Sequence, residues 1–162
     1  MSRPGQADIA ALLRSLVEGG VEFIVVGGAA AVLHGAPVTT LDLDIVLRAD
    51  DENLSRLHQT LSKLDAIVRE PGDRRLRPTL QHLRASGQLN LTTRLGPLDS
   101  FRELHDGRDF EDLLPASVNL ADGELTIRVI DLHTLIEIKS ATSRAKDRLV
   151  VPILLALIDS EQ

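Results

Sequence analysis

Two aspartates separated by one residue are the first feature of this sequence that could do chemistry. Asp42 and Asp44 lie in residues 39–47, where apolar and polar residues alternate. Alternation with a period of two is typical of a β-strand, so both carboxylates would project from one face and repel each other. A hard divalent cation, most simply Mg2+, removes that repulsion and suits oxygen ligands. The pattern therefore predicts a metal-binding pair, and the alternative is an ordinary solvated strand face.

A glycine pair precedes the acidic pair in the chain. Gly27 and Gly28 follow residues 21–26, a mostly apolar run that predicts a short buried strand, and precede residues 29–34, which predict a short helix. Backbone N–H groups at the start of a helix are open to an anion, so this turn suits a phosphate. The same pair also fits a tight strand-to-helix turn without a ligand.

In this order, the strand, glycine pair, short helix and acidic strand resemble the nucleotidyltransferase superfamily with the DNA polymerase β-like fold. That family's signature is a Gly-Gly or Gly-Ser turn followed by an Asp-x-Asp strand. The likeness is greatest to small bacterial toxin-like members of the AbiEii/MenT type, and it covers about residues 8–158. Asp99 matches the family's third carboxylate, on a later strand. Lys139 matches a late lysine, and Lys146 and Asp147 match a following basic-acidic pair.

The resemblance implies transfer of a nucleoside monophosphate from an NTP to an acceptor hydroxyl, with two Mg2+ ions. It makes Asp42, Asp44 and Asp99 the catalytic and metal-binding acids. It also implies a set of nucleotide-binding residues, namely Gly27, Gly28, Thr40, Lys139, Lys146 and Asp147. The leading acceptor is tRNA, as in toxin–antitoxin systems, and an antitoxin protein is a further expected partner.

Other interpretations stay open. Val38 lies where members of this branch often have a basic residue, which favours a catalytically inactive nucleotide-binding or partner-binding module of the same fold. A nucleotidyltransferase for small molecules such as antibiotics fits the same motifs, and a structural protein with incidental acids is the remaining reading. Residues 69–84 hold five of the 18 basic residues and are the best candidate for a contact with RNA or a triphosphate.

The composition limits the class of protein. The chain has 162 residues, a net charge of −6 and 43% hydrophobic residues, which suits one α/β (α+β) domain over residues 1–162, a mixed sheet flanked by helices. No apolar run is long enough for a membrane span, and no secretory signal is visible, so we expect a cytoplasmic protein. The absence of cysteine excludes thiol catalysis and thiolate metal sites. The negative charge argues against binding to duplex DNA.

The elements that must position these residues follow from hydrophobic periodicity. We expect helices at about residues 9–17 and 51–64, and a strand at residues 89–95 that turns at Gly96 and Pro97 into an extended segment. A hairpin and two final helices complete the chain. They are expected at residues 118–130, at residues 131–142 and from Lys146 onward, the last helix interrupted at Pro152.

Overall fold

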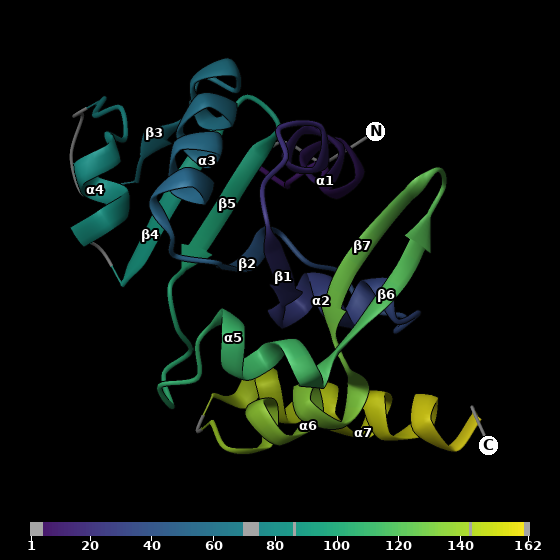
Figure 1. Cartoon of the computed structure of the whole chain (residues 1–162). Coiled ribbons are helices and arrows are strands. Elements are labelled where there is room, and N and C mark those ends of the chain that lie inside the picture. Colours follow the sequence, from purple (N-terminus) through teal and green to yellow (C-terminus); the bar gives the residue numbers. More distant parts are fainter. Residues whose placement is uncertain (1–4, 70–74, 86, 143, 161–162) are drawn as a thin grey trace.

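A seven-stranded mixed sheet flanked by helices forms the molecule in the computed structural model, which describes residues 5–69, 75–85, 87–142 and 144–160 (Figure 1). The strands are β1 (Phe23–Val26), β2 (Leu43–Leu47), β3 (Ile67–Val68), β4 (Gln88–Thr93), β5 (Gly96–Phe101), β6 (Ser117–Asp122) and β7 (Leu125–Ile130). The helices are α1 (Ile9–Glu18), α2 (Gly27–Leu33), α3 (Asp51–Lys63), α4 (Leu80–Ala85), α5 (Phe110–Leu113), α6 (Leu132–Ser140) and α7 (Ala145–Ser160), with a 3-10 turn at Leu114–Ala116. The expected α/β class with a mixed sheet is confirmed.

The strand order is β3-β4-β5-β2-β1-β7-β6, so β1 and β2 lie near the middle of the sheet. β1 is antiparallel to β2 and parallel to β7, whereas β2 is parallel to β5. All four residues of β1 are buried, as are all residues of β2 except Asp44. A carboxylate such as that of Asp44 is unfavourable within a buried sheet unless it has a partner. Asp44 lies at the end of the sheet where β1 stops and β2 starts.

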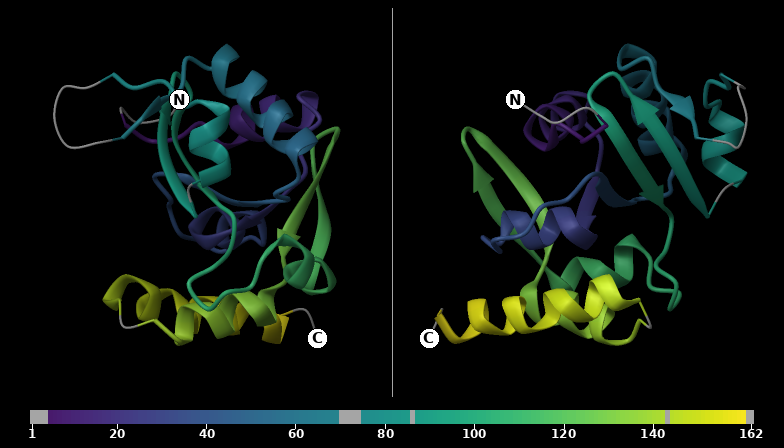
Figure 2. Two further views of the ribbon diagram at one scale, coloured as in Figure 1. Left: turned by 60° about the vertical axis from the view of Figure 1, so that its left-hand side comes forward. Right: turned by 180° about the vertical axis from the view of Figure 1, so that it is seen from behind.

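Helices cover the sheet in two groups. Figures 1 and 2 show α6 and α7 side by side as a layer beyond one end of the central strands, while α1 and α3 lie toward the other end. Among the described residues, no helix is both long enough and apolar enough to cross a membrane. The α6–α7 layer lies at the end of the sheet that carries the acidic residues.

Aspartates begin three of the expected helices. The Asp8 carboxylate accepts a hydrogen bond from the backbone N–H of Ala11 at the start of α1, and Asp50 and Asp131 cap α3 and α6 in the same way. Such caps satisfy N–H groups that have no partner within the helix and stabilise it by about 1 kcal/mol. These helices and the β6–β7 hairpin are confirmed within a few residues.

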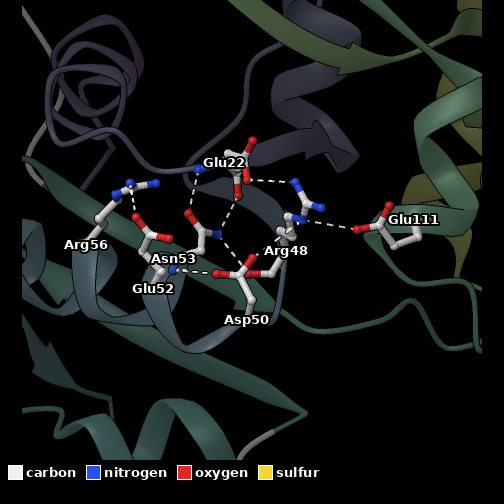
Figure 3. A network of polar contacts seen from close by, with 7 residues as sticks. All are labelled: Glu22, Arg48, Asp50, Glu52, Asn53, Arg56 and Glu111. Atoms are coloured by element: carbon white, nitrogen blue, oxygen red, sulfur yellow. Dashed lines mark hydrogen bonds and ion pairs between the residues drawn. The ribbon is translucent and has the colours of Figure 1, made fainter.

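A buried asparagine fixes the outer ends of β1 and β2 to α3. Asn53 is 1% exposed; its Nδ2 donates to the carbonyl oxygens of Glu22 (2.8 Å) and Arg48 (2.7 Å), and its Oδ1 accepts from the Glu22 N–H (2.7 Å) (Figure 3). Arg48 also forms exposed ion pairs with Glu22, Asp50 and Glu111 (Figure 3). Since Glu22 precedes β1 and Arg48 follows β2, this network anchors the strand ends opposite the acidic residues.

The strand expected from residue 39 is wrong in its first four residues. β2 begins at Leu43, and Leu41, which the alternation would place on the same face as Leu43 and Ile45, is 60% exposed. β1 ends at Val26, the partner of Asp44, and the chain then turns into α2, so residues before Leu43 have no neighbour on that strand. The Thr40 hydroxyl instead donates to the Asp42 carbonyl oxygen at 3.0 Å and bends the segment.

Three boundaries also differ from the sequence analysis. α2 begins at Gly27 itself, and the turn between β4 and β5 lies at residues 94–95, so Gly96 and Pro97 belong to β5. α7 continues through Pro152 without interruption. The proline lacks one N–H donor, but its neighbours Val150, Ile153 and Leu154 pack against the core, and this packing outweighs the lost hydrogen bond.

Candidate active site

Three carboxylates meet where β2 and β5 lie side by side. Asp44 on β2 is the register partner of Asp99 on the parallel strand β5, so the two side chains lie next to each other on one face of the sheet. Asp42 lies in the bend just before β2. One oxygen from each of the three side chains lies within 4.8 Å of the others. The structure therefore brings together the three acids that the sequence singled out, although Asp42 is not itself in a strand.

The glycine pair lies directly against this cluster. Gly27 has a φ of +65°, and a Cβ atom at this position would lie 2.5 Å from the Asp44 Oδ2. A Cβ atom on Gly28 would lie 2.8 Å from the Thr40 Oγ1. Both distances are shorter than real contacts of Cβ atoms, so any other residue would push the acidic segment away. The pair permits close approach between the start of α2 and the metal-binding candidates.

Burial raises the pKa of two of the acids. Desolvation, together with the nearby charge of Asp42, raises the pKa of Asp44 to about 6. Desolvation and the contact with Asp42 raise the pKa of Asp99 to about 7, although the charge of Arg69 opposes this rise. Among the described residues, the Asp44 Oδ1 is buried and has no hydrogen-bond partner. A cation between the carboxylates would supply the missing partner and favour their ionised forms.

Arg69 is a site residue that the sequence analysis did not single out by itself. It directly follows β3, and its Nη2 forms an ion pair with the Asp99 Oδ1. The sequence placed it only within a basic stretch, because pairing it with Asp99 requires knowing that β3 and β4 continue the sheet beyond β5. In that stretch Arg84 pairs instead with Asp51 on α3, and Arg74 lies outside the described residues.

A buried ion pair joins α6 to α7. The Lys139 Nζ lies 3.2 Å from the Asp147 Oδ1, and both side chains are at most 12% exposed. The Thr142 hydroxyl donates to the Asp147 Oδ2 at 2.8 Å. Burial alone would raise the pKa of Asp147, but the hydrogen bonds from Thr142 and Lys139 outweigh it and hold the pKa below its usual value. Lys139 is therefore not a solvated helix charge, and Asp147, within the first turn of α7, does not serve as the helix cap.

One cleft collects the predicted site residues. It has a volume of about 660 Å3 and lies between the sheet and the α6–α7 layer. Its lining includes all nine residues proposed from the sequence, namely Gly27, Gly28, Thr40, Asp42, Asp44, Asp99, Lys139, Lys146 and Asp147. A cleft of this size is in the range of small-ligand sites. His34 is not part of this lining, and its Nε2 contacts the Ile130 carbonyl oxygen at 2.7 Å.

The mixed sheet flanked by helices is a nucleotidyltransferase-like fold. Two solved structures share it. TM1012 from Thermotoga maritima, a candidate nucleotidyltransferase, is 19% identical with a TM-score of 0.57, covering 96% of each chain. The lincosamide antibiotic adenylyltransferase LnuA, in its lincomycin-bound form, is 13% identical with a TM-score of 0.65, covering 92% of this chain and 95% of LnuA. No family model matches the chain, and no curated protein matches it in sequence.

Proposed function

We propose that this chain is a Mg2+-dependent nucleotidyltransferase, which transfers a nucleoside monophosphate from an NTP to an acceptor hydroxyl and releases pyrophosphate. The observation that carries the proposal is the meeting of Asp42, Asp44 and Asp99 within 4.8 Å, in a cleft that also holds the glycine turn. The fold shared with TM1012 and LnuA supports the same reading. The expected membership of the AbiEii/MenT branch stays a prediction.

The three carboxylates fit a divalent cation. They offer only hard oxygen donors, which Mg2+ prefers, and the buried Asp44 Oδ1 has no partner among the described residues. Asp42, Asp44 and Asp99 would hold the metal, and we propose two ions. When bound, Mg2+ supplies positive charge that stabilises the phosphates as negative charge shifts toward the leaving group.

The order of the strands separates the two substrates. Asp44 lies between Asp99 on β5 and the end of β1, where Gly27 follows. We place the triphosphate on the β1 side, where the N-cap residue Val26 has no side-chain group to cap the first N–H groups of α2. Lys139 and Lys146 line the same cleft and would neutralise phosphate charge, with Asp147 holding Lys139 in place.

The acceptor then lies on the β5 side, next to Asp99. The acceptor oxygen forms a bond to the α-phosphorus of the NTP while the bond from that phosphorus to its bridging oxygen breaks, and pyrophosphate leaves on the far side. The proton of the acceptor hydroxyl passes to the Asp99 carboxylate, which the structure places within the acidic cluster. Asp99 is thus the side chain of the protein that takes part directly in this proton transfer.

The acceptor has two candidate classes. The resemblance in sequence to toxin-like members favours tRNA, with an antitoxin protein as the regulator. The fold shared with LnuA, whose structure contains lincomycin, favours a small hydroxylated molecule such as an antibiotic. We rank tRNA first and test both acceptors in one assay.

The test uses each of the four NTPs labelled at the α-phosphate, with Mg2+ and either total tRNA or lincosamide and aminoglycoside antibiotics. We expect transfer of label by the unmodified protein and none by Asp44→Asn. Asp51→Asn is the matched control, because Asp51 is an exposed aspartate on α3 that pairs with Arg84 outside the cleft. Binding of NTP without transfer to any acceptor would favour the inactive module, and equal transfer by Asp44→Asn would refute the proposed site.

A further inference from the structure

The ion pair between Arg69 and Asp99 lies at the edge of the acidic cluster. The backbone N–H of Arg69 donates to the Asn90 carbonyl oxygen at 2.9 Å, and Asn90 on β4 is the register partner of Asp99. The Arg69 backbone is thus held to the same row of the sheet as the acids. From there its guanidinium reaches across β4 to the Asp99 Oδ1.

The same carboxylate is needed for two incompatible tasks. Asp99 supplies one of the three oxygens that lie within 4.8 Å of one another, and its Oδ1 also pairs with Arg69. A guanidinium and a divalent cation on one carboxylate repel each other, so full use of Asp99 as a metal ligand weakens its pair with Arg69. Without a cation, Arg69 compensates the negative charge of Asp99 through this ion pair.

We propose that Arg69 is a positioning residue that serves as the counter-ion of Asp99 in the metal-free protein and leaves it when a divalent cation binds. This inference rests on the proposed function, because it requires a metal site at the three acids. Arg69 lowers the affinity for the cation but keeps Asp99 in place beforehand. The class of ligand that displaces it is a hard divalent cation.

The exposure of the two partners supports an exchange over a permanent contact. The Arg69 side chain is 36% exposed, so its charge can return to water when the pair opens, whereas the Asp99 side chain is 12% exposed and stays in the cluster. The pair of Lys139 and Asp147 differs, because both of its side chains are at most 12% exposed. Of these two pairs, the Arg69 pair is therefore the better able to open when a cation binds.

The test measures binding of Mn2+ to the full chain by electron paramagnetic resonance, without nucleotide. Arg69→Met and Arg69→Gln remove the competing charge, and we expect each to bind Mn2+ about tenfold more tightly, equivalent to about 1.4 kcal/mol. Arg69→Lys keeps a positive charge and should stay closer to the unmodified protein. Arg144→Met is the matched control, since Arg144 also lines the cleft but contacts Asp147 and not the three acids, and it should change the affinity less than twofold.

Unchanged or weaker Mn2+ binding by folded Arg69→Met and Arg69→Gln would overturn the inference. Loss of folding in both variants that Mn2+ does not restore, checked by circular dichroism, would also overturn it, because the bound cation takes over the role of the lost counter-ion. An equal gain of affinity in Arg144→Met would also overturn it, since the effect would then be long-range charge alone. If the unmodified protein binds no Mn2+, the proposed function fails together with this inference; if it binds but Arg69 has no effect, only this inference fails.

Discussion

Replacing Gly27 by alanine tests the close approach between the glycine turn and the acidic cluster. The new Cβ atom would lie 2.5 Å from the Asp44 Oδ2, whereas carbon and oxygen normally approach to about 3.5 Å, so the carboxylate must move by about 1 Å. A misplacement of this size in a catalytic group lowers the rate by about 100-fold. We therefore expect Gly27→Ala to lose about 100-fold in nucleotidyl transfer and to bind Mn2+ more weakly.

The hairpin between β6 and β7 offers a matched control. Gly123 has the same φ of +65° as Gly27, but a Cβ atom there would meet nothing within 4 Å. Alanine costs about 1 kcal/mol at either position because of the left-handed backbone, and this lowers the melting temperature of a chain of this length by about 2–4 °C. Gly123→Ala should therefore lose this stability and keep full transfer activity and Mn2+ affinity.

Three measurements separate the loss of stability caused by the left-handed backbone from the loss of activity caused by the displaced Asp44 carboxylate. They are transfer of labelled nucleotide, Mn2+ binding and thermal unfolding. The reasoning requires that both variants lose similar stability through the backbone and that Gly27→Ala alone loses transfer. If Gly27→Ala retained activity within threefold of the unmodified protein, or if Gly123→Ala lost as much, the glycine turn would not hold the acids in place.

Three further outcomes follow from the described contacts. Asp147→Asn leaves the buried Lys139 charge uncompensated and should lower the free energy of unfolding by about 3–5 kcal/mol in urea titrations. The double variant Lys139→Met with Asp147→Leu removes both charges and should lower the free energy of unfolding by less. Folding raises the pKa of Asp44 and Asp99 above the value of 3.8 expected in the unfolded chain, so both carboxyls stay protonated to a higher pH in the folded protein. Their contribution to the stability of the metal-free protein is therefore present below pH 4 and lost as the pH rises to about 7. The melting temperature should fall accordingly between pH 4 and 8, and this dependence on pH should flatten when both residues are changed to asparagine. Asn53→Ala should lower the free energy of unfolding by about 2–3 kcal/mol while the folded protein keeps its Mn2+ affinity; weakened Mn2+ binding would link that network to the site.

Local signals were enough to predict most helices, whereas the third acid came from the resemblance to a known family. Aspartate caps and 3.6-residue periodicity place α1, α3 and α6, because those signals are contained within each segment. Asp99 was found by resemblance, and its in-register pairing with Asp44 then brings it to the cluster. The expected cytoplasmic location, the tRNA acceptor and the antitoxin stay predictions.

The features that sequence reasoning missed depend on tertiary contacts. Alternation extended the strand back to residue 39, but a strand needs a neighbour, and β1 ends opposite Asp44. Pro152 indicated a break in α7, yet the packing of that helix on the core keeps it continuous. Arg69 gained its partner only through the order of β3, β4 and β5 in the sheet, which no local pattern encodes.

The most direct test of the metal site is anomalous diffraction from crystals grown with Mn2+ and a non-hydrolysable NTP. We predict an anomalous peak among the carboxylates of Asp42, Asp44 and Asp99, with the triphosphate on the side of Gly27. A bound nucleotide with no peak between these side chains, or a peak at another place in the molecule, would contradict the account.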